Sequence, residues 1–290
     1  MPKFAAVDGA LLHYELINSL DNDADCLSPV IVISGGGSRH PSYLGDLAGL
    51  SNRHLLAVPH LRGVGESPAA NSSESGSFWK QAQDIESLRE HLRLERVCIV
   101  GHSAGTRLAM AYAVQFPQRL SGLILIGPPA GYLVDEPSDI NLLIETRRGE
   151  PVFDAAIAAQ QTNSQPSSDE EFNARQQLVA PAGYAAWGVK EQAHARAGYW
   201  NLAASNAYFS IAPPEDFAAQ LGRVTVPVLV VIGARDCFTG VAPLKALSKL
   251  FPAGKATVID ECGHYPWVEQ PTAFRQVLDP LVDECCISMS

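Results

Sequence analysis

Short apolar runs alternate with amphipathic stretches along most of the chain, and this alternation predicts the secondary structure. Two N-terminal segments, Phe4–Val7 and Leu11–Leu16, have the pattern of exposed strands. Runs rich in apolar residues predict strands at Pro29–Ser34, His54–Pro59, Arg96–Gly101, Ser121–Gly127, Val226–Gly233 and Ala256–Asp260. The first three of these and Val226–Gly233 are expected to be buried. Helical spacing of apolar residues marks Ser77–Leu94, Thr106–Phe116, Ala242–Leu250 and Pro271–Asp283. Strands and helices in alternation predict an α/β fold, a mostly parallel sheet flanked by helices.

The alternation is interrupted once, between residues 131 and 214. This segment has no strand-like run; it is rich in alanine and glutamine, and its aromatic residues recur at helical spacing. A polar stretch at residues 162–173 predicts one flexible connection within it. We therefore expect one core, made of residues 1–130 and 215–290, with a helical insertion at residues 131–214 that caps it.

Composition excludes several classes of protein. The net charge of −10 over 290 residues argues against binding to nucleic acid or to an anionic membrane, which needs a surplus of lysine and arginine. The N-terminal residues do not have the pattern of a signal peptide, and we find no membrane-spanning run, so a cytoplasmic location is expected. The six cysteines show no metal-ligand spacing, so no metal site is predicted.

Three residues with complementary chemistry follow predicted strands of the sheet, in the chain order Ser103, Asp236, His264. Ligands bind at the carboxyl edge of open α/β sheets, where these residues are expected to meet. A serine hydroxyl becomes a good nucleophile when an imidazole removes its proton, and a carboxylate behind the imidazole fixes its tautomer. This pattern predicts a serine nucleophile at Ser103, a base at His264 and an orienting acid at Asp236.

The glycines around Ser103 and in an upstream loop predict how a negative oxygen would be held. Ser103 lies between Gly101 and Gly105 where a strand becomes a helix, a sharp turn that exposes the hydroxyl. Such a turn directs the backbone N–H of the next residue, Ala104, at the developing oxyanion. The second donor is expected from the loop after the first buried strand, and our choice there is Gly36.

Several longer stretches resemble the α/β-hydrolase superfamily. They are Leu61–Pro68, Asp84–Gly131, Gly233–Phe238 and Glu261–Pro271, and they are most similar to capped serine hydrolases of the proline-iminopeptidase-like branch. The resemblance covers nearly the whole chain. It implies the α/β-hydrolase fold with a helical cap, the same roles for Ser103, Asp236 and His264, and catalysis without a cofactor.

The sequence also departs from that branch at specificity positions. Its loop reads Ser-Gly-Gly-Gly-Ser at 34–38 instead of His-Gly-Gly-Pro-Gly, its elbow has Ala104 where the branch has tryptophan, and His60 replaces an aspartate. Residues expected to line a substrate pocket are Gly35, Gly37, His102, Trp187, Glu191, Trp200 and Tyr208. Of these, Glu191 is the candidate for binding the free amine of a substrate.

These observations predict a serine hydrolase that cleaves an ester, amide or lactone of a small, largely apolar molecule through an acyl-enzyme. Three alternatives stay open at this point. They are a proline-iminopeptidase-like aminopeptidase, a non-hydrolytic or cyclising enzyme on the same scaffold, and a ligand receptor without turnover.

Overall fold

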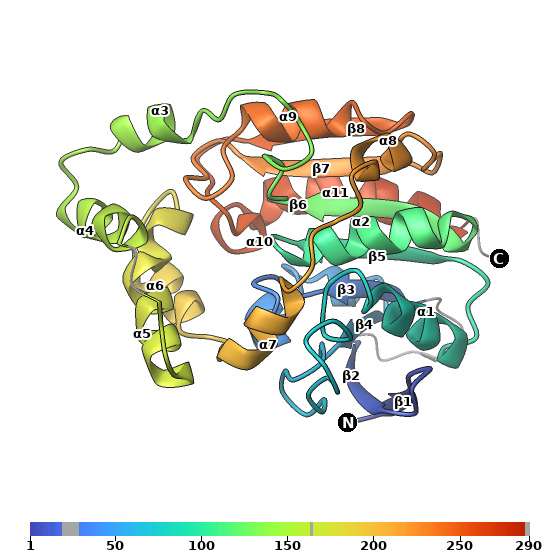
Figure 1. The fold of residues 1–290 in the computed structure, drawn as a ribbon. Coiled ribbons are helices and arrows are strands. Elements are labelled where there is room, and N and C mark those ends of the chain that lie inside the picture. Colours follow the sequence, from blue (N-terminus) through green and yellow to red (C-terminus); the bar gives the residue numbers. More distant parts are fainter. Residues whose placement is uncertain (19–28, 163–164, 288–290) are drawn as a thin grey trace.

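A computed structural model describes residues 1–18, 29–162 and 165–287, and an eight-stranded sheet forms its centre (Figure 1). The strands are β1 (Lys3–Ala5), β2 (Leu11–Ile17), β3 (Val30–Ile33), β4 (Leu56–Pro59), β5 (Val97–His102), β6 (Leu120–Ile126), β7 (Val228–Gly233) and β8 (Gly254–Ile259). Their order across the sheet is β1-β2-β4-β3-β5-β6-β7-β8. Strands β1 and β2 pair antiparallel, and all pairs from β4 to β8 are parallel. The expected mostly parallel sheet is confirmed.

The two faces of the sheet are buried in two separate hydrophobic clusters. Ile31 and Ile33 of β3 belong to the cluster that contains residues of α1 (Ala82–His91), α2 (Gly105–Gln115), α8 (Phe217–Leu221) and α9 (Ala242–Ser248). Val30 and Val32 point the other way, into the cluster that contains residues of α10 (Pro266–Glu269) and α11 (Pro271–Ile287). Because successive side chains of a strand face opposite sides, a strand covered on both faces must be apolar throughout. This explains the uniform apolar runs of the sequence.

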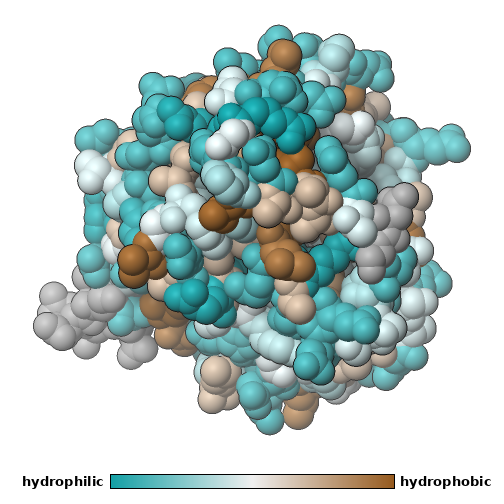
Figure 2. Space-filling view, turned by 90° about the vertical axis from the view of Figure 1, so that its left-hand side faces the viewer, coloured by the Kyte–Doolittle hydropathy of each residue, from teal (hydrophilic) through white to brown (hydrophobic). Residues whose placement is uncertain are grey.

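The α-helices between β6 and α8 all belong to the inserted segment. Among the described residues of this segment, no β-strand is formed. These helices are α3 (Ile140–Glu145), α4 (Pro151–Gln160), α5 (Asp169–Val179), α6 (Val189–Ala195) and α7 (Leu202–Tyr208). Helices α4, α5 and α6 lie to one side of the sheet (Figure 1). Seen from that side, apolar side chains gather near the middle of a mostly hydrophilic face (Figure 2). The boundaries of the insertion at residues 131 and 214 stay predictions.

Several short elements complete the chain and refine the expected boundaries. Four 3-10 helices occur among the described residues: η2 (Pro41–Leu44), η3 (Leu50–Asn52), η4 (Pro117–Arg119) and η5 (Ala180–Gly183). The helix expected from Ser77 begins at Ala82, and the last helix continues past Pro280 to Ile287. Helices α8 and α10 were not expected, because each is too short to show a period.

The polar stretch at residues 162–173 is only partly a connection. Residues 163–164 lie outside the described part, but α5 begins at Asp169. The Ser168 side chain caps α5 by accepting a hydrogen bond from the Glu171 N–H, and three acidic residues follow in the first turn. Hydroxyls at the N-cap and negative charges in the first turn stabilise a helix. These polar residues therefore start a helix, which corrects the expectation of a flexible connection across the whole stretch.

Two further findings concern the thiols and the membrane. Cys98, Cys237, Cys262, Cys285 and Cys286 are free, and Cys26 lies outside the described residues. Within the described ranges, no helix combines the length and the apolar character needed to cross a bilayer.

Candidate active site

Ser103 occupies a strained turn directly after β5. Its φ is 52°, a left-handed conformation that non-glycine residues rarely adopt, and its N–H donates a hydrogen bond of 2.8 Å to the carbonyl of Ile126. A Cβ added to Gly105 would overlap the Ser34 carbonyl oxygen, so only glycine allows α2 to start this close to β3. The turn leaves Ser103 partly exposed at the wall of a cavity.

Asp236 and His264 form a short, buried pair at the same edge of the sheet. The Nδ1 atom of His264 lies 2.6 Å from Oδ2 of Asp236, and both side chains are almost fully buried. Asp236 follows β7, and His264 lies in the loop after β8. His264 lines the same cavity as Ser103. The structure thus brings together the acid and base that the sequence places 28 residues apart.

Hydrogen bonds keep Asp236 ionised. Its Oδ1 accepts from the N–H groups of Phe238 and Thr239, at 2.8 and 3.3 Å, and its Oδ2 accepts from the Thr239 hydroxyl at 2.6 Å. Burial by itself would raise the pKa of Asp236, but the charge and hydrogen bond of His264 and the other donors outweigh it and lower the pKa. An ionised Asp236 only accepts, so His264 carries its proton on Nδ1 and its Nε2 is free to act as a base.

A buried hydrogen-bond chain connects the glycine loop to both His102 and His264. The Gly35 N–H donates to the Tyr43 hydroxyl at 2.6 Å, and that hydroxyl lies 2.8 Å from Nδ1 of His102. Nε2 of His102 lies 3.0 Å from the His264 carbonyl oxygen and must donate to it. Burial, followed by the charge of His264, lowers the pKa of His102 well below its usual value, so the ring is neutral. The Tyr43 hydroxyl therefore donates to Nδ1 of His102. Both ring nitrogens of His102 thus have a hydrogen-bond partner.

The two expected oxyanion donors are the backbone N–H groups of Ala104, which follows Ser103, and of Gly36, in the loop after β3. Within the described residues, no acceptor is found for the N–H of Ala104 or of Gly36. Gly36 has a φ of 72°, and a Cβ there would overlap the ring of Trp200. Gly35, in contrast, has already committed its N–H to Tyr43. The choice of Gly36 rather than Gly35 is consistent with this arrangement and stays a prediction.

The cavity in front of Ser103 has a volume of about 380 Å³ and mixes apolar and polar walls. Core residues contribute Ser103, Ala104 and His264, while the insertion contributes Trp200, Phe209 and parts of α4 and α5. No aspartate or glutamate lies among the described residues that line it. A substrate would therefore contact both the sheet edge and the insertion.

Of the seven expected pocket residues, the structure places only Trp200 at this cavity. Gly35 is packed against His102 and Ser103, and Gly37 against the ring of Tyr208. The remaining four also lie away from the cavity, in structural contacts: His102 in the chain above, Trp187 against Tyr184, Glu191 at the N-terminus of α6, and Tyr208 with its hydroxyl bonded to the Ala104 carbonyl.

Glu191 has a structural contact in place of the expected free amine. Its Oε2 accepts a hydrogen bond of 2.9 Å from the Gly188 N–H, and the side chain is buried outside the cavity. The sequence signal was a capping arrangement, in which a glutamate at the third helical position reaches back to the residue before the helix.

Sequence reasoning missed several cavity residues. They are Arg39, Arg107, Phe238 and Tyr265 from the core, together with Gln160, Gln176 and Tyr184 from the insertion. Arg107 could have been found, because it falls in the first turn of the helix that the sequence predicts shortly after Ser103. The others are brought to the cavity by packing between distant segments.

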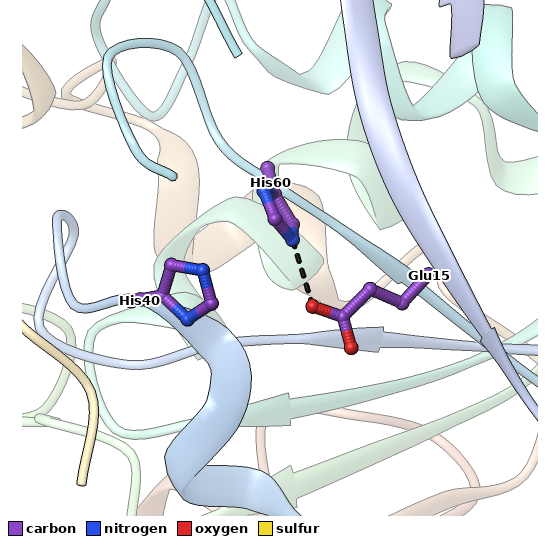
Figure 3. A group of neighbouring side chains, drawn as sticks. All are labelled: Glu15, His40 and His60. Atoms are coloured by element: carbon purple, nitrogen blue, oxygen red, sulfur yellow. Dashed lines mark hydrogen bonds and ion pairs between the residues drawn. The ribbon is translucent and has the colours of Figure 1, made fainter. Parts of the chain in front are cut away.

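A second group of polar side chains, Glu15, His40 and His60, lies behind the glycine loop (Figure 3). Nε2 of His60 lies 3.0 Å from Oε1 of Glu15, while Nδ1 of His60 accepts the Glu66 N–H and Nδ1 of His40 accepts the Ser42 N–H. A neutral ring that accepts at Nδ1 carries its proton on Nε2, where a metal would need a lone pair. The arrangement favours hydrogen bonding over metal binding. His60 thereby accepts a hydrogen bond from the Glu66 N–H, as an aspartate at this position could.

Comparison with known proteins agrees with this geometry. Residues 28–271 match the family model described as alpha/beta hydrolase fold, and the chain belongs to that family. Proline iminopeptidase of Neisseria gonorrhoeae is 27% identical over 268 residues, covering 81% of this chain and 82% of the relative.

Other relatives carry out different reactions on this fold. The 2-hydroxy-6-oxononadienedioate/2-hydroxy-6-oxononatrienedioate hydrolase 1 of Dechloromonas aromatica is 27% identical over 208 residues, covering 68% of this chain and 66% of the relative. The esterase RhEst1 from Rhodococcus sp. ECU1013 superposes with a TM-score of 0.73 at 19% identity, covering 100% and 99% of the two chains. The α/β-hydrolase fold and the likeness to proline iminopeptidases are thus confirmed.

Proposed function

We propose that this protein is a serine hydrolase that cleaves an ester or lactone of a small molecule through an acyl-enzyme. The observation that carries the proposal is the pair of His264 and Asp236, 2.6 Å apart, at the wall of the cavity where Ser103 is held in a left-handed turn. Backbone strain of this kind is maintained where the surrounding structure over-determines it, which is typical of catalytic positions.

In the proposed mechanism, Nε2 of His264 removes the proton of the Ser103 hydroxyl as its oxygen attacks the substrate carbonyl. Asp236 holds the ring through Nδ1 and stabilises the imidazolium that forms. His264 then gives the proton to the leaving alcohol. A water molecule, activated by His264 in the same way, attacks the acyl-enzyme and releases the acid.

The negative oxygen formed in each step would be held by the N–H groups of Ala104 and Gly36. Both groups lack an acceptor within the described residues, and Ala104 lies at the N-terminus of α2, whose dipole favours a negative charge. Donors that are already oriented need no rearrangement when the charge develops, and one such donor contributes about 10²- to 10³-fold in rate.

The insertion at residues 131–214 would act as a cap that selects the substrate. It supplies Trp200 and Phe209 to the cavity, and the cavity mixes apolar groups with arginine and glutamine side chains. An aminopeptidase needs an acidic group to bind a free amine. The lining contains none among the described residues, and Glu191 is engaged at Gly188, so these contacts favour an ester or a lactone.

Replacing Ser103 with alanine tests the mechanism. We expect Ser103→Ala to lose about 10⁴-fold or more of the kcat of wild type on 4-nitrophenyl esters, because no other group can form the acyl-enzyme. A fluorophosphonate probe should label wild type at Ser103 and leave the alanine variant unlabelled, as measured by mass spectrometry. Thermal unfolding should show that both proteins fold alike. Equal turnover by the two proteins would contradict the proposal.

A further inference from the structure

Two arginines line the cavity in front of Ser103, and they differ in how their charge is used. The guanidinium of Arg39 donates to the Ala197 carbonyl at 2.7 Å and to the His194 carbonyl at 3.2 Å, and it lies over the ring of Tyr43. The side chain is almost fully buried and ties the loop after β3 to the insertion. Arg39 is therefore occupied by the fold itself.

Arg107 has no such partners. Its guanidinium lies 4.1 Å from the ring centre of Tyr132 and 5.4 Å from that of Phe209, and the side chain is half-buried at the cavity wall. Its Nε atom is buried, and within the described residues neither a hydrogen-bond acceptor nor a carboxylate pairs with it. The hydroxyl of Tyr132, beneath it, is likewise buried without a partner.

A buried donor without an acceptor, such as Nε of Arg107, lowers the stability of the fold and therefore indicates that a ligand supplies the acceptor. Leaving such a group without an acceptor destabilises a protein by about 1–3 kcal/mol, and by more for charged groups. The chain as a whole has an excess of ten negative charges, so carboxylates are plentiful, yet none lines the cavity among the described residues. The site thus keeps a positive charge available for a ligand.

The position of Arg107 relates this charge to the reacting bond. Arg107 is the third residue of α2, four residues after Ser103, and both side chains line one cavity. The N-terminus of α2 adds a partial positive charge to the same region. A guanidinium offers paired N–H donors that match the two oxygens of a carboxylate, and a single arginine matches a single negative charge.

We infer that the substrate is an ester or lactone that carries a carboxylate a few bonds from the scissile carbonyl, and that Arg107 binds this carboxylate. The inference rests on the proposed function, because it names the class of substrate for the same site. Hemiesters of short dicarboxylic acids belong to this class. Tyr132 and Phe209 hold the guanidinium in place by stacking.

The test compares anionic and neutral esters of similar size. The probes are mono-4-nitrophenyl glutarate, with the carboxylate on the acyl part, 4-carboxyphenyl pentanoate, with the carboxylate on the leaving group, and neutral 4-nitrophenyl pentanoate. For Arg107→Gln we expect kcat/KM on one of the anionic probes to fall about 10- to 100-fold more than on the neutral probe, as for a lost charge-assisted hydrogen bond. Arg107→Lys should recover part of the loss.

A control separates charge from fold. Arg119 is half exposed and lies outside the cavity, so Arg119→Gln removes the same charge and should leave the ratio of anionic to neutral rates as in wild type. Thermal unfolding of each variant checks that it is folded. Equal losses on anionic and neutral probes in Arg107→Gln would overturn the inference.

A binding measurement keeps this result distinct from failure of the hydrolase proposal. In Ser103→Ala, which cannot react, calorimetric titration of mono-4-nitrophenyl glutarate and 4-carboxyphenyl pentanoate reports the subsite alone. We expect Ser103→Ala/Arg107→Gln to bind one of them at least tenfold more weakly. If wild type hydrolyses no ester but this difference holds, the proposed chemistry fails and the subsite stands. If both proteins bind both probes equally, the subsite fails.

Discussion

The parallel sheet and the helical insertion contribute to the cavity in different ways. From the sheet side come Ser103 and His264, which follow strands β5 and β8, while Asp236 follows β7 and contacts His264 from behind. From the insertion come side chains such as Trp200 and Phe209, which flank the short helix α7. Strands β3 to β7 are buried along their whole length, whereas α5 has no fully buried residue. In the proposed mechanism, the buried sheet therefore holds the reacting groups and the more exposed insertion shapes the substrate site.

The largest expected effect follows from removing the acid of the rigid part. Asp236→Asn keeps the size of the side chain but can no longer stabilise a charged His264, and it favours the wrong tautomer. We expect kcat to fall about 10³- to 10⁴-fold on every substrate alike, as measured by steady-state kinetics.

Phe209→Ala in the insertion is the counterpart of that variant. It should change the ratio of kcat/KM between a large and a small apolar ester by about tenfold and leave the small ester almost unaffected, since a hydrophobic contact of this size contributes about 1–3 kcal/mol. A uniform fall in kcat on all esters for Phe209→Ala would break the division between the two regions.

Two glycines, Gly105 at the start of α2 and Gly131 at the start of the insertion, test how closely the backbone is packed in each region. Gly105→Ala would press a Cβ against the carbonyl oxygens of Ser34 and Ile33, whereas a Cβ at Gly131 meets nothing within 4 Å. We expect Gly105→Ala to lower the free energy of unfolding by about 1–3 kcal/mol, as overpacking does. Gly131→Ala should stay within about 0.5 kcal/mol of wild type. Urea denaturation measures both, and equal stabilities would contradict the close packing at the elbow.

The smallest effect concerns Glu269, a half-buried carboxylate that joins the two regions. Its Oε1 accepts the Ala185 N–H of the insertion at 2.6 Å, and its Oε2 accepts the Gly263 N–H beside His264 at 2.7 Å. Burial raises the pKa of Glu269 to about 7, although the hydrogen bonds oppose this. The native protein thus holds this proton more tightly than the unfolded chain does.

The sign of the pH dependence follows from that raised pKa. The stabilising contribution of protonated Glu269 is complete below the ordinary glutamate pKa and is lost as the pH rises through the folded pKa of about 7. As the pH rises from about 4.5 to 7, the free energy of unfolding should fall less in Glu269→Gln than in wild type. Exposed Glu170→Gln serves as the control and should follow wild type. A slope in Glu269→Gln that equals that of wild type would contradict the assignment.

Much of the fold could be predicted from the sequence, and so could the proximity of Asp236 and His264, but most of the pocket could not. Buried strands show as uniform apolar runs, and Ser103 shows by its flanking glycines. Trp187 and Trp200 are alike in the sequence, yet only Trp200 lines the cavity, because its segment pairs with Arg39 in the loop after β3. No local pattern records which of two tryptophans packs against a distant loop.

The sequence by itself determined the α/β architecture, the insertion and the chain order of Ser103, Asp236 and His264, because burial on both faces and sharp turns restrict which residues can occupy those positions. Only the tertiary structure decided that His102 joins Tyr43 to the His264 loop and that Nε of Arg107 is left unpaired. These outcomes depend on which acceptors lie within hydrogen-bond distance after folding. Such proximity arises from long-range packing and leaves no periodic signal in the chain.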